Sequence, residues 1–240
     1  MNQTIITDIT QGLTTAFIDH TVSSNLAYRP QFVSNNYKEG RKVISSIEDE
    51  LLSCEQFAIS VAFITMSGIT PLLQTLKELE KRGIPGRILT TDYLTFSDPK
   101  ALRKLEEFSN LHVKMYVTDQ TEEGFHTKGY IFKKEEMYRI IVGSSNMTLS
   151  ALTVNREWNT RIVSTEQGEY AQSVLTEFED LWNSPQAVEF EQFIDSYTEN
   201  YTRNKIIRKQ KELARQEQIP SLEAYRLQPN SMQTGFINNL

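Results

Sequence analysis

A short and almost entirely apolar segment, residues 57–64, constrains the fold of this chain more than any other feature. It reads Phe-Ala-Ile-Ser-Val-Ala-Phe-Ile, and its length is typical of a strand rather than of a helix. A strand that is apolar on both faces is buried on both, as in sheets that are covered by helices. We therefore expect this segment to lie inside a helix-covered sheet.

Helical and strand patterns alternate around this segment. Apolar residues at helical spacing predict helices at residues 43–52, 72–79, 99–108 and 167–182. Short apolar runs predict further strands at residues 87–90, 112–117, 129–132, 139–142 and 157–163. Strands that alternate with helices favour parallel pairing. The predicted fold class is therefore α/β, with a mixed, mostly parallel β-sheet flanked by helices.

Charge patterning divides the rest of the chain. Residues 166–199 hold nine acidic side chains and no Lys or Arg, whereas 203–215 hold six basic side chains and Glu212 as the one acid. We predict an N-terminal extension at 1–40, a folded domain at 41–199, a basic linker helix at 200–226, and the start of a further domain at 227–240.

Composition excludes several classes of protein. The chain has one cysteine and three scattered histidines, which argues against a disulfide framework and against a metal site. Neither a secretory signal nor an apolar run of membrane-spanning length is present, so we expect a cytoplasmic protein without a membrane partner. The net charge of −6 argues against nucleic acid as a partner, although a local basic face can still bind phosphates.

The chemistry-bearing residues lie between residues 125 and 159. His126 and Lys128 are two apart, so in a strand both project from one face. Ser144 and Asn146 follow Gly143 directly after an apolar strand, at the end where α/β folds bind ligands. A second His-x-Lys pair at 112–114 has no such partner segment, and we interpret it as part of an ordinary strand.

These side chains suit attack on phosphorus. A neutral His126 imidazole can form a phosphohistidine, while Lys128, Ser144 and Asn146 bind the phosphate oxygens. Glu157 can accept a hydrogen bond from His126 Nδ1, which leaves Nε2 free to attack. The chain holds no duplicate of the motif to supply a second general acid, so a second copy of the chain is expected to complete the site.

The pattern resembles the signature of the phospholipase D superfamily, and within it the single-motif nucleases that act as homodimers. In those nucleases a glutamate lies eleven residues beyond the asparagine, as Glu157 does here relative to Asn146. The spacing of eighteen residues from Lys128 to Asn146 resembles the metal-independent restriction endonuclease of the superfamily. The resemblance implies catalytic roles for His126, Lys128, Asn146 and Glu157, with no cofactor and with DNA as substrate.

A longer string, residues 143–159, is similar to the nuclease-like domain that precedes bacterial superfamily 2 helicases of the DEAD/DEAH type. Residues 229–233 resemble the glutamine motif at the start of such helicases. The resemblance implies a phospholipase D-like nuclease domain at 41–199 and a truncated helicase from 227, with ATP and Mg²⁺ needed only by the helicase. It also implies a role in restriction, repair or phage defence.

Two alternatives and one departure remain. The same pocket can serve a catalytically weak DNA-binding or dimerisation module that positions the helicase, whereas lipid hydrolysis has no lipid-facing stretch to support it. The family's aspartate five residues after the lysine is replaced here by Lys133. Large aromatic residues near the motif, namely Tyr130, Phe132, Trp158 and Trp182, are expected in the core rather than as base-stacking surfaces.

Overall fold

The computed structural model describes residues 2–118 and 124–218 of the 240-residue chain. Its strands are β1 (Gln31–Val33), β2 (Gln56–Val61), β3 (Gly86–Thr91), β4 (Leu111–Tyr116), β5 (Lys128–Lys134), β6 (Met137–Gly143), β7 (Asn159–Thr165) and β8 (Ala187–Glu189). Its α-helices are α1 (Gln3–Phe17), α2 (Val43–Ser53), α3 (Met66–Ile69), α4 (Leu73–Lys81), α5 (Pro99–Glu106), α6 (Leu149–Thr153), α7 (Glu169–Trp182) and α8 (Phe190–Gln218).

The strands form one sheet in the order β1-β7-β6-β5-β2-β3-β4-β8. Neighbours among β2, β3 and β4 are parallel, and every other neighbouring pair in this sheet is antiparallel. The predicted α/β class with a mixed sheet and flanking helices is confirmed. The prediction that the sheet is mostly parallel is wrong.

The connections explain this difference. Helices α3 and α4 join β2 to β3, and α5 joins β3 to β4, which gives crossovers long enough for parallel pairing. Between β5 and β6 the chain has only Glu135 and Glu136, with Glu135 at a φ of 54°. A two-residue turn can join only antiparallel neighbours, so β6 runs opposite to β5.

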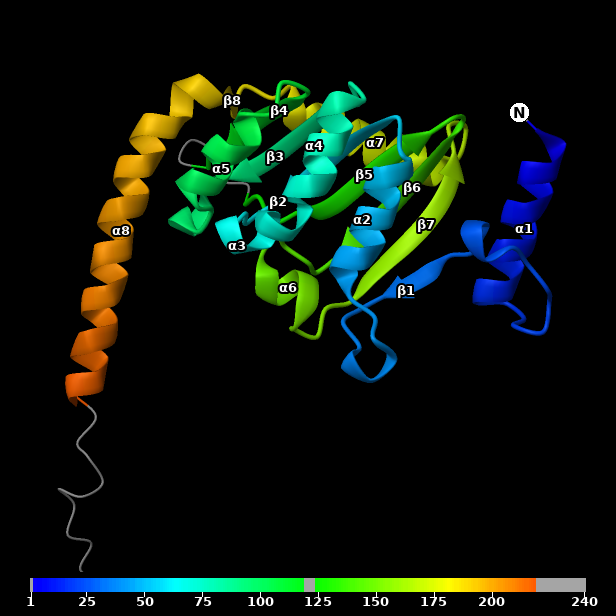
Figure 1. The fold of residues 1–240 in the computed structure, drawn as a ribbon, viewed down its shortest axis with the longest axis horizontal. Helices are drawn as coiled ribbons and strands as arrows, with labels where there is room; N and C mark the ends of the chain where they lie inside the picture. The colour runs from blue at the N-terminus through cyan, green and yellow to red at the C-terminus, as the bar shows by residue number, and fades with distance from the viewer. Residues whose placement is uncertain (1, 119–123, 219–240) are drawn as a thin grey trace, which may run out of the picture. The chain divides into compact units, whose positions relative to one another are not determined.

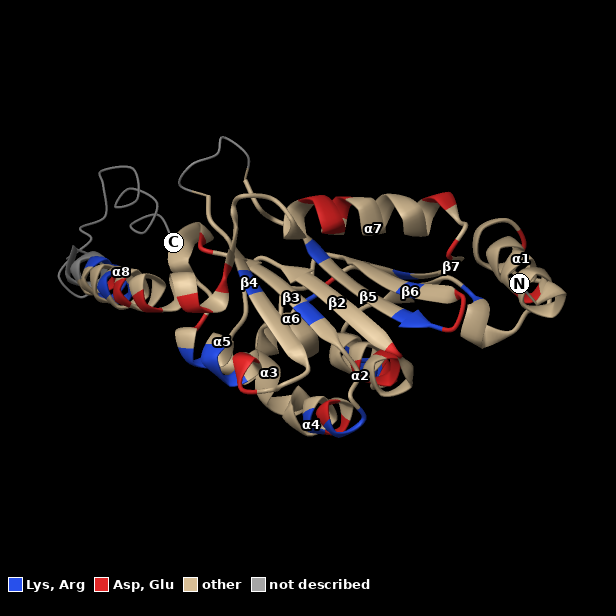
Figure 2. Ribbon diagram, turned by 90° about the horizontal axis from the view of Figure 1, so that it is seen from above, with Lys and Arg blue, Asp and Glu red and all other residues tan. Residues whose placement is uncertain are grey.

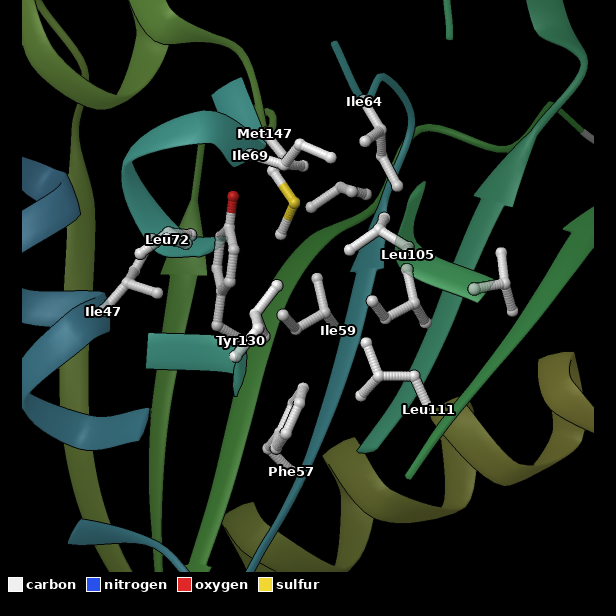
Figure 3. Packing of buried hydrophobic residues seen from close by; sticks show 14 of the residues in the cluster. Ile47, Phe57, Ile59, Ile64, Ile69, Leu72, Leu105, Leu111, Tyr130 and Met147 are labelled. Carbon is white, nitrogen blue, oxygen red and sulfur yellow. The ribbon is translucent and has the colours of Figure 1, made fainter. Parts of the chain in front are cut away.

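Helices cover both faces of the sheet. In Figure 2, α7 lies against one face, whereas α2, α3, α4 and α5 lie against the other. Alternate residues of β5 fill the two layers: Tyr130 and Phe132 pack in the larger core with α2 and α4, and Ile131 packs beneath α7. Figure 3 shows Tyr130 among the larger core's aliphatic side chains. Trp182 packs in the smaller core, so the core prediction is confirmed for these three aromatic residues.

Residues 1–40, predicted as an extension, contribute an edge strand. β1 pairs antiparallel with β7, with Gln31 opposite Arg161 and Val33 opposite Asn159. Helix α1 places Ile9 beside Met137 and Val163 in a small apolar cluster. β1 continues into the loop that precedes α2 (Figure 1), so this segment lies alongside the strands that carry the predicted site.

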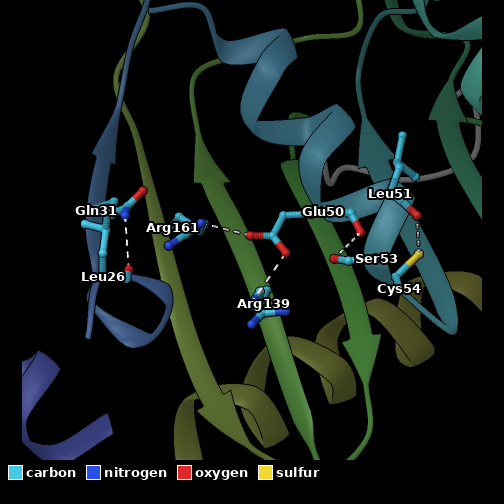
Figure 4. A network of polar contacts seen from close by, with 8 residues as sticks. All are labelled: Leu26, Gln31, Glu50, Leu51, Ser53, Cys54, Arg139 and Arg161. Carbon is cyan, nitrogen blue, oxygen red and sulfur yellow. Dashed lines mark hydrogen bonds and ion pairs between the residues drawn. The ribbon is translucent and has the colours of Figure 1, made fainter. Parts of the chain in front are cut away.

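A buried ion cluster joins α2 to the sheet. The Glu50 carboxylate accepts from Arg161 at 3.0 Å and lies 3.6 Å from the Arg139 guanidinium, as Figure 4 shows. Only 6% of the Glu50 side chain is exposed. Burial raises the pKa of this carboxyl, while the two arginines act in the opposite direction.

The chain divides into two compact units, residues 1–201 and residues 202–240. Phe193, Ile194 and Tyr197 of α8 are buried in the larger core of the first unit. The basic residues of 203–215 are helical, as predicted, within α8. The segment at 227–240, predicted as the start of a further domain, lies outside the described residues. In the described part of the chain, no helix is long and apolar enough to cross a membrane.

Candidate active site

The predicted site residues lie at one end of the sheet. His126 and Lys128 stand just before and at the start of β5, Ser144 and Asn146 follow the end of β6, and Glu157 precedes β7. The antiparallel registers of β5 with β6 and of β6 with β7 bring these three strand ends side by side. The structure therefore gathers all five residues, although they span 32 positions of sequence.

The His126 imidazole and the Lys128 ammonium are in direct contact. Lys128 Nζ lies 2.8 Å from His126 Nδ1 and donates to the His126 carbonyl oxygen, also at 2.8 Å. Lys128 is buried, whereas His126 is exposed. Because a charged ammonium only donates, Nδ1 is the acceptor, and the neutral ring carries its proton on Nε2.

Burial also sets the electrostatics of Lys128. It lowers the pKa of the ammonium below its ordinary value, and the negative charge of Glu157 acts in the opposite direction. Within residues 2–118 and 124–218, no carboxylate forms an ion pair with Lys128. Its two close contacts are a ring nitrogen and a carbonyl oxygen, both uncharged. The ammonium thus keeps its positive charge available to an anion.

Glu157 is engaged by the neighbouring loop rather than by the imidazole. Its Oε2 accepts a short hydrogen bond from Ser144 Oγ, which in turn accepts from the Trp158 backbone N–H at 3.1 Å. The hydrogen bond that we expect between His126 Nδ1 and Glu157 is not formed in this structure. In the sheet, β6 lies between β5, which the imidazole precedes, and β7, which the carboxylate precedes. The loop that follows β6 is therefore nearer to the carboxylate than the imidazole is.

Asn146 connects the site to β2. Its Oδ1 accepts from the Phe63 backbone N–H at 3.1 Å, which leaves the amide NH₂ group as the end that can donate to a ligand. The Phe63 ring in turn meets the His126 ring edge to face, with centroids 6.4 Å apart. Phe63 was not predicted from the sequence, because in the apolar run it has the pattern of a core residue.

The loop after β6 is fixed by hydrogen bonds to side chains of β5 and β7. Tyr130, whose buried hydroxyl points toward the side of the core where Met147 lies (Figure 3), donates to the Ser145 carbonyl at 3.0 Å. Asn159 accepts from the Ser145 N–H and donates to its hydroxyl. Gly143 is needed here, because a Cβ at this position would lie 2.2 Å from the Trp158 carbonyl oxygen. Ser144 and Asn146 are therefore presented by a preorganised backbone.

The other His-x-Lys pair and Lys133 have structural surroundings. His112 lies near the start of β4, at the opposite end of the sheet, and Lys114 pairs with Glu189 at 3.0 Å. Lys133 projects from the other face of β5 and pairs with Glu166 at 2.7 Å. Lys133, at the position where the resemblance implies an aspartate, therefore lies on the opposite face of β5 from Lys128.

Trp158 corrects one prediction. From the sequence this residue is expected in the core, but 74% of its surface is exposed. Its ring meets the exposed Phe32 ring edge to face, with centroids 5.9 Å apart. The strand begins at Asn159 rather than at Glu157, so Trp158 belongs to the loop and not to the alternating strand. No pattern in the sequence marks that boundary.

No group of three or more His, Cys, Asp or Glu side chains in the described ranges is placed to hold a metal ion. The arrangement instead offers a ring nitrogen, a buried ammonium, a hydroxyl and an amide at the end of one sheet. Together these groups can bind a phosphate and present a nucleophile to it.

Comparisons with known proteins address the family and the fold of this chain. The chain matches the family described as cardiolipin synthase, PLD-like domain, over residues 49–182. It is similar to NucT from Helicobacter pylori, at 16% identity and a TM-score of 0.52, over 68% of this chain and 99% of that one. Nuc from Salmonella typhimurium, a phospholipase D family member, gives 18% identity and a TM-score of 0.52 over the same shares.

A third similar structure is phosphatidylserine synthase from Haemophilus influenzae, at 15% identity and a TM-score of 0.51. That match covers 77% of this chain and 46% of the synthase. No curated protein matches the chain. At these identities the structural likeness shows the fold, whereas the matched family covers more than half of the chain.

Proposed function

This chain belongs to the PLD-like domain family, and from that premise we propose that its site cleaves phosphodiester bonds in DNA through a phosphohistidine at His126, without a metal ion. The observation that carries the proposal is the exposed His126 imidazole held 2.8 Å from the buried Lys128 ammonium. An imidazole beside a cation is poorly suited to core packing and well suited to an anionic phosphate.

The phosphate groups of the substrate change the contacts of Lys128. When a diester binds, Lys128 Nζ moves from Nδ1 onto a non-bridging oxygen, where the opposite charge makes the stronger hydrogen bond. The Asn146 amide binds another oxygen, and the Ser144 hydroxyl turns its proton from Glu157 onto the phosphate. Nδ1 is then free to carry the ring proton and donate it to Glu157, so Nε2 is left as the nucleophile.

The reaction proceeds in two displacements. His126 Nε2 forms a bond to phosphorus as the bond to the leaving oxygen breaks, and that oxygen takes a proton from a general acid. Water then attacks phosphorus and gives up a proton to the group that served as general acid, while the bond between phosphorus and His126 Nε2 breaks. This step releases a phosphomonoester and restores the ring. The general acid is His126 of a second copy of the chain, since the described residues offer no second imidazole at this end of the sheet.

The test uses the purified chain in EDTA with single-stranded DNA and with bis(p-nitrophenyl) phosphate. Wild type is expected to turn over both, and His126→Ala to lose at least about a thousandfold in rate. The matched control is His112→Ala, the other histidine of a His-x-Lys pair, which retains wild-type turnover. An acid-labile, base-stable phosphoryl adduct at His126 identifies the intermediate. Strict dependence on Mg²⁺ contradicts the proposal.

A second candidate is a DNA-binding or dimerisation module with little turnover. It is favoured by one observation, namely that Glu157 bonds to Ser144 and not to the imidazole in this structure. It predicts salt-dependent DNA binding with no trapped phosphohistidine. The adduct experiment above separates the two candidates.

The wider setting rests on the sequence alone. The similarity of 143–159 to helicase-linked nuclease domains supports attachment to a helicase, and hence a role in restriction, repair or phage defence. Expression of the gene's full product, followed by an assay of DNA-stimulated ATP hydrolysis, tests that attachment directly. ATP and Mg²⁺ are expected to serve that activity and not the site at His126.

A further inference from the structure

A groove of about 810 Å³ adjoins the candidate active site, and no known role accounts for it. One wall is the loop at residues 34–42 between β1 and α2, and the other is the segment 153–158 that leads into β7. The first wall lies outside the part of the chain that matches the PLD-like family, residues 49–182. One wall of the groove is thus formed by residues that precede the matched family domain, and the other by residues within it.

Hydrogen bonds fix the two walls of the groove relative to each other. The Asn35 amide donates to the carbonyl oxygens of Ala151 at 2.8 Å and Asn155 at 2.7 Å. Its Oδ1 accepts from the Val43 N–H at the start of α2. One side chain thus ties the two walls to each other and to the helix.

The groove joins the candidate site directly. Glu157 and Trp158 line it, and both bond to Ser144: the carboxylate accepts from the hydroxyl, and the Trp158 N–H donates to it. Glu157 also acts electrostatically on Lys128. A polymer lying in the groove therefore leads straight to the groups that surround His126.

The lining is basic in a protein whose net charge is −6. The lining residues include four cations and one carboxylate, that of Glu157. The cations are Lys38, Arg41, Lys42 and Arg156. Arg41 pairs with Glu39 at 3.1 Å, but within the described ranges no carboxylate pairs with the other three cations. Such a strip of positive charge suits a phosphate backbone.

Two exposed aromatic rings stand among these charges. Tyr37 is fully exposed and Trp158 is 74% exposed, and both line the groove. The Phe32 ring supports the Trp158 ring edge to face, which fixes its orientation without covering it. Large aromatic rings left in water next to cations are typical of surfaces on which unpaired bases stack.

We propose that this groove binds the single-stranded segment of a nucleic acid next to the scissile phosphate, with bases stacked on Trp158 and Tyr37. Lys38, Lys42 and Arg156 contact the backbone phosphates. The proposal rests on the proposed function, since it assigns the strand that the site at His126 cleaves. Duplex DNA is excluded from the stacking surfaces, because its bases present no free face.

The test measures binding separately from cleavage. A fluorescein-labelled oligothymidine is titrated by anisotropy against the His126→Ala chain, which cannot cleave it. Adding Trp158→Ala or Tyr37→Ala is expected to weaken binding about five- to hundredfold. Tyr170→Ala, which removes a partly exposed aromatic ring on α7, is the matched control and leaves the affinity unchanged. Because Tyr37 is fully exposed, its variant folds normally, and circular dichroism verifies this.

The charges give a second readout. Lys42→Gln with Arg156→Gln is expected to lower the slope of log K against log salt by about 1.4, or about 0.7 for each phosphate that the protein no longer neutralises. Affinities within twofold of the parent in both aromatic variants overturn the proposal. The proposal is also overturned if duplex DNA binds as tightly as the oligothymidine and loses as much affinity in the aromatic variants. A change from dimer to monomer in Trp158→Ala overturns it as well. Absence of bis(p-nitrophenyl) phosphate turnover in wild type contradicts the proposed function instead.

Discussion

Two buried charged clusters in this molecule, one around Glu50 and one around Lys128, differ in how their charge is met. In both, burial shifts the pKa toward the neutral form. Glu50 lies between two guanidinium groups and is neutralised in place, whereas Lys128 meets only a ring nitrogen and a carbonyl oxygen. A buried charge with bonded counter-charges holds elements together, and we infer that one without them is available to a ligand.

The largest effect is expected from Glu50→Ala. It leaves Arg139 and Arg161 buried without their carboxylate, so the free energy of unfolding should fall by about 3–5 kcal/mol. Diester turnover per folded molecule should remain at the wild-type level, because the cluster lies away from the site. Urea denaturation and active-site-normalised rates measure the two quantities.

A triple replacement sharpens that result. Glu50→Leu with Arg139→Met and Arg161→Met removes every charge of the cluster, and two guanidinium nitrogens of Arg161 already have no hydrogen-bond partner among the described residues. Stability should return close to the wild-type value or exceed it, since an apolar set of similar volume avoids desolvation. A triple variant as unstable as Glu50→Ala contradicts the role of unpaired charge.

Lys128→Met is expected to show the opposite behaviour. Diester turnover should fall about a hundred- to thousandfold, because a preorganised cation beside the phosphate is removed. Stability should be unchanged or higher, since no partner carboxylate is left unpaired within the described residues. Lys114→Met, at the matching position of the other His-x-Lys pair, is the control. If Lys128→Met lowers the free energy of unfolding but not the rate of turnover, Lys128 has a structural role instead.

Ser144→Ala tests the contact between Glu157 and the loop after β6. Removal of a hydroxyl that donates to a carboxylate should lower turnover about tenfold. Ser109→Ala is the matched control, because Ser109 Oγ also donates to a carboxylate, that of Glu80, at 3.0 Å and far from the site. Equal rates in the two variants would show that Glu157 needs no support from Ser144.

The smallest expected effect is a shift in the pH dependence of turnover. Burial lowers the pKa of Lys128 below 10.5, so its charge is lost at a lower pH in the folded state than in the unfolded chain. Turnover should decline on the alkaline side before pH 10.5, and Lys128→Arg should move that decline upward. Because the folded state binds fewer protons in this window, Lys128 makes stability rise with pH there, and Lys128→Met should abolish that contribution.

Much of the fold followed from local patterns. The first five residues of the apolar run at 57–64 lie in β2, which ends at Val61, and the helices around it lie where apolar spacing predicts them. Strand direction was missed in the second half, because alternation reveals that a segment is a strand and not which way it runs. For β6, the two-residue connection at Glu135 and Glu136 decides that direction, and its length is known only once the strand ends are known.

Motif spacing predicted which side chains lie near one another, and not which of them are bonded. Motif spacing placed His126, Lys128, Asn146 and Glu157 together, and the strand ends do converge. Spacing along the chain does not show that β6 separates β5 from β7, so the bond between Glu157 and Ser144 could not be foreseen. The groove depends on residues 34–42, whose position follows from the pairing of β1 with β7.

The two outermost strands, β1 and β8, contain three residues each. Edges this short offer few unpaired backbone groups to a neighbouring chain, so lateral growth of the sheet from one molecule into the next is disfavoured. Pairing between copies of this protein is thereby steered toward the ends and faces of the sheet. The short edge strands thus disfavour fibrous association. They also leave the end of the sheet that carries the His126 imidazole as a place where two copies can meet.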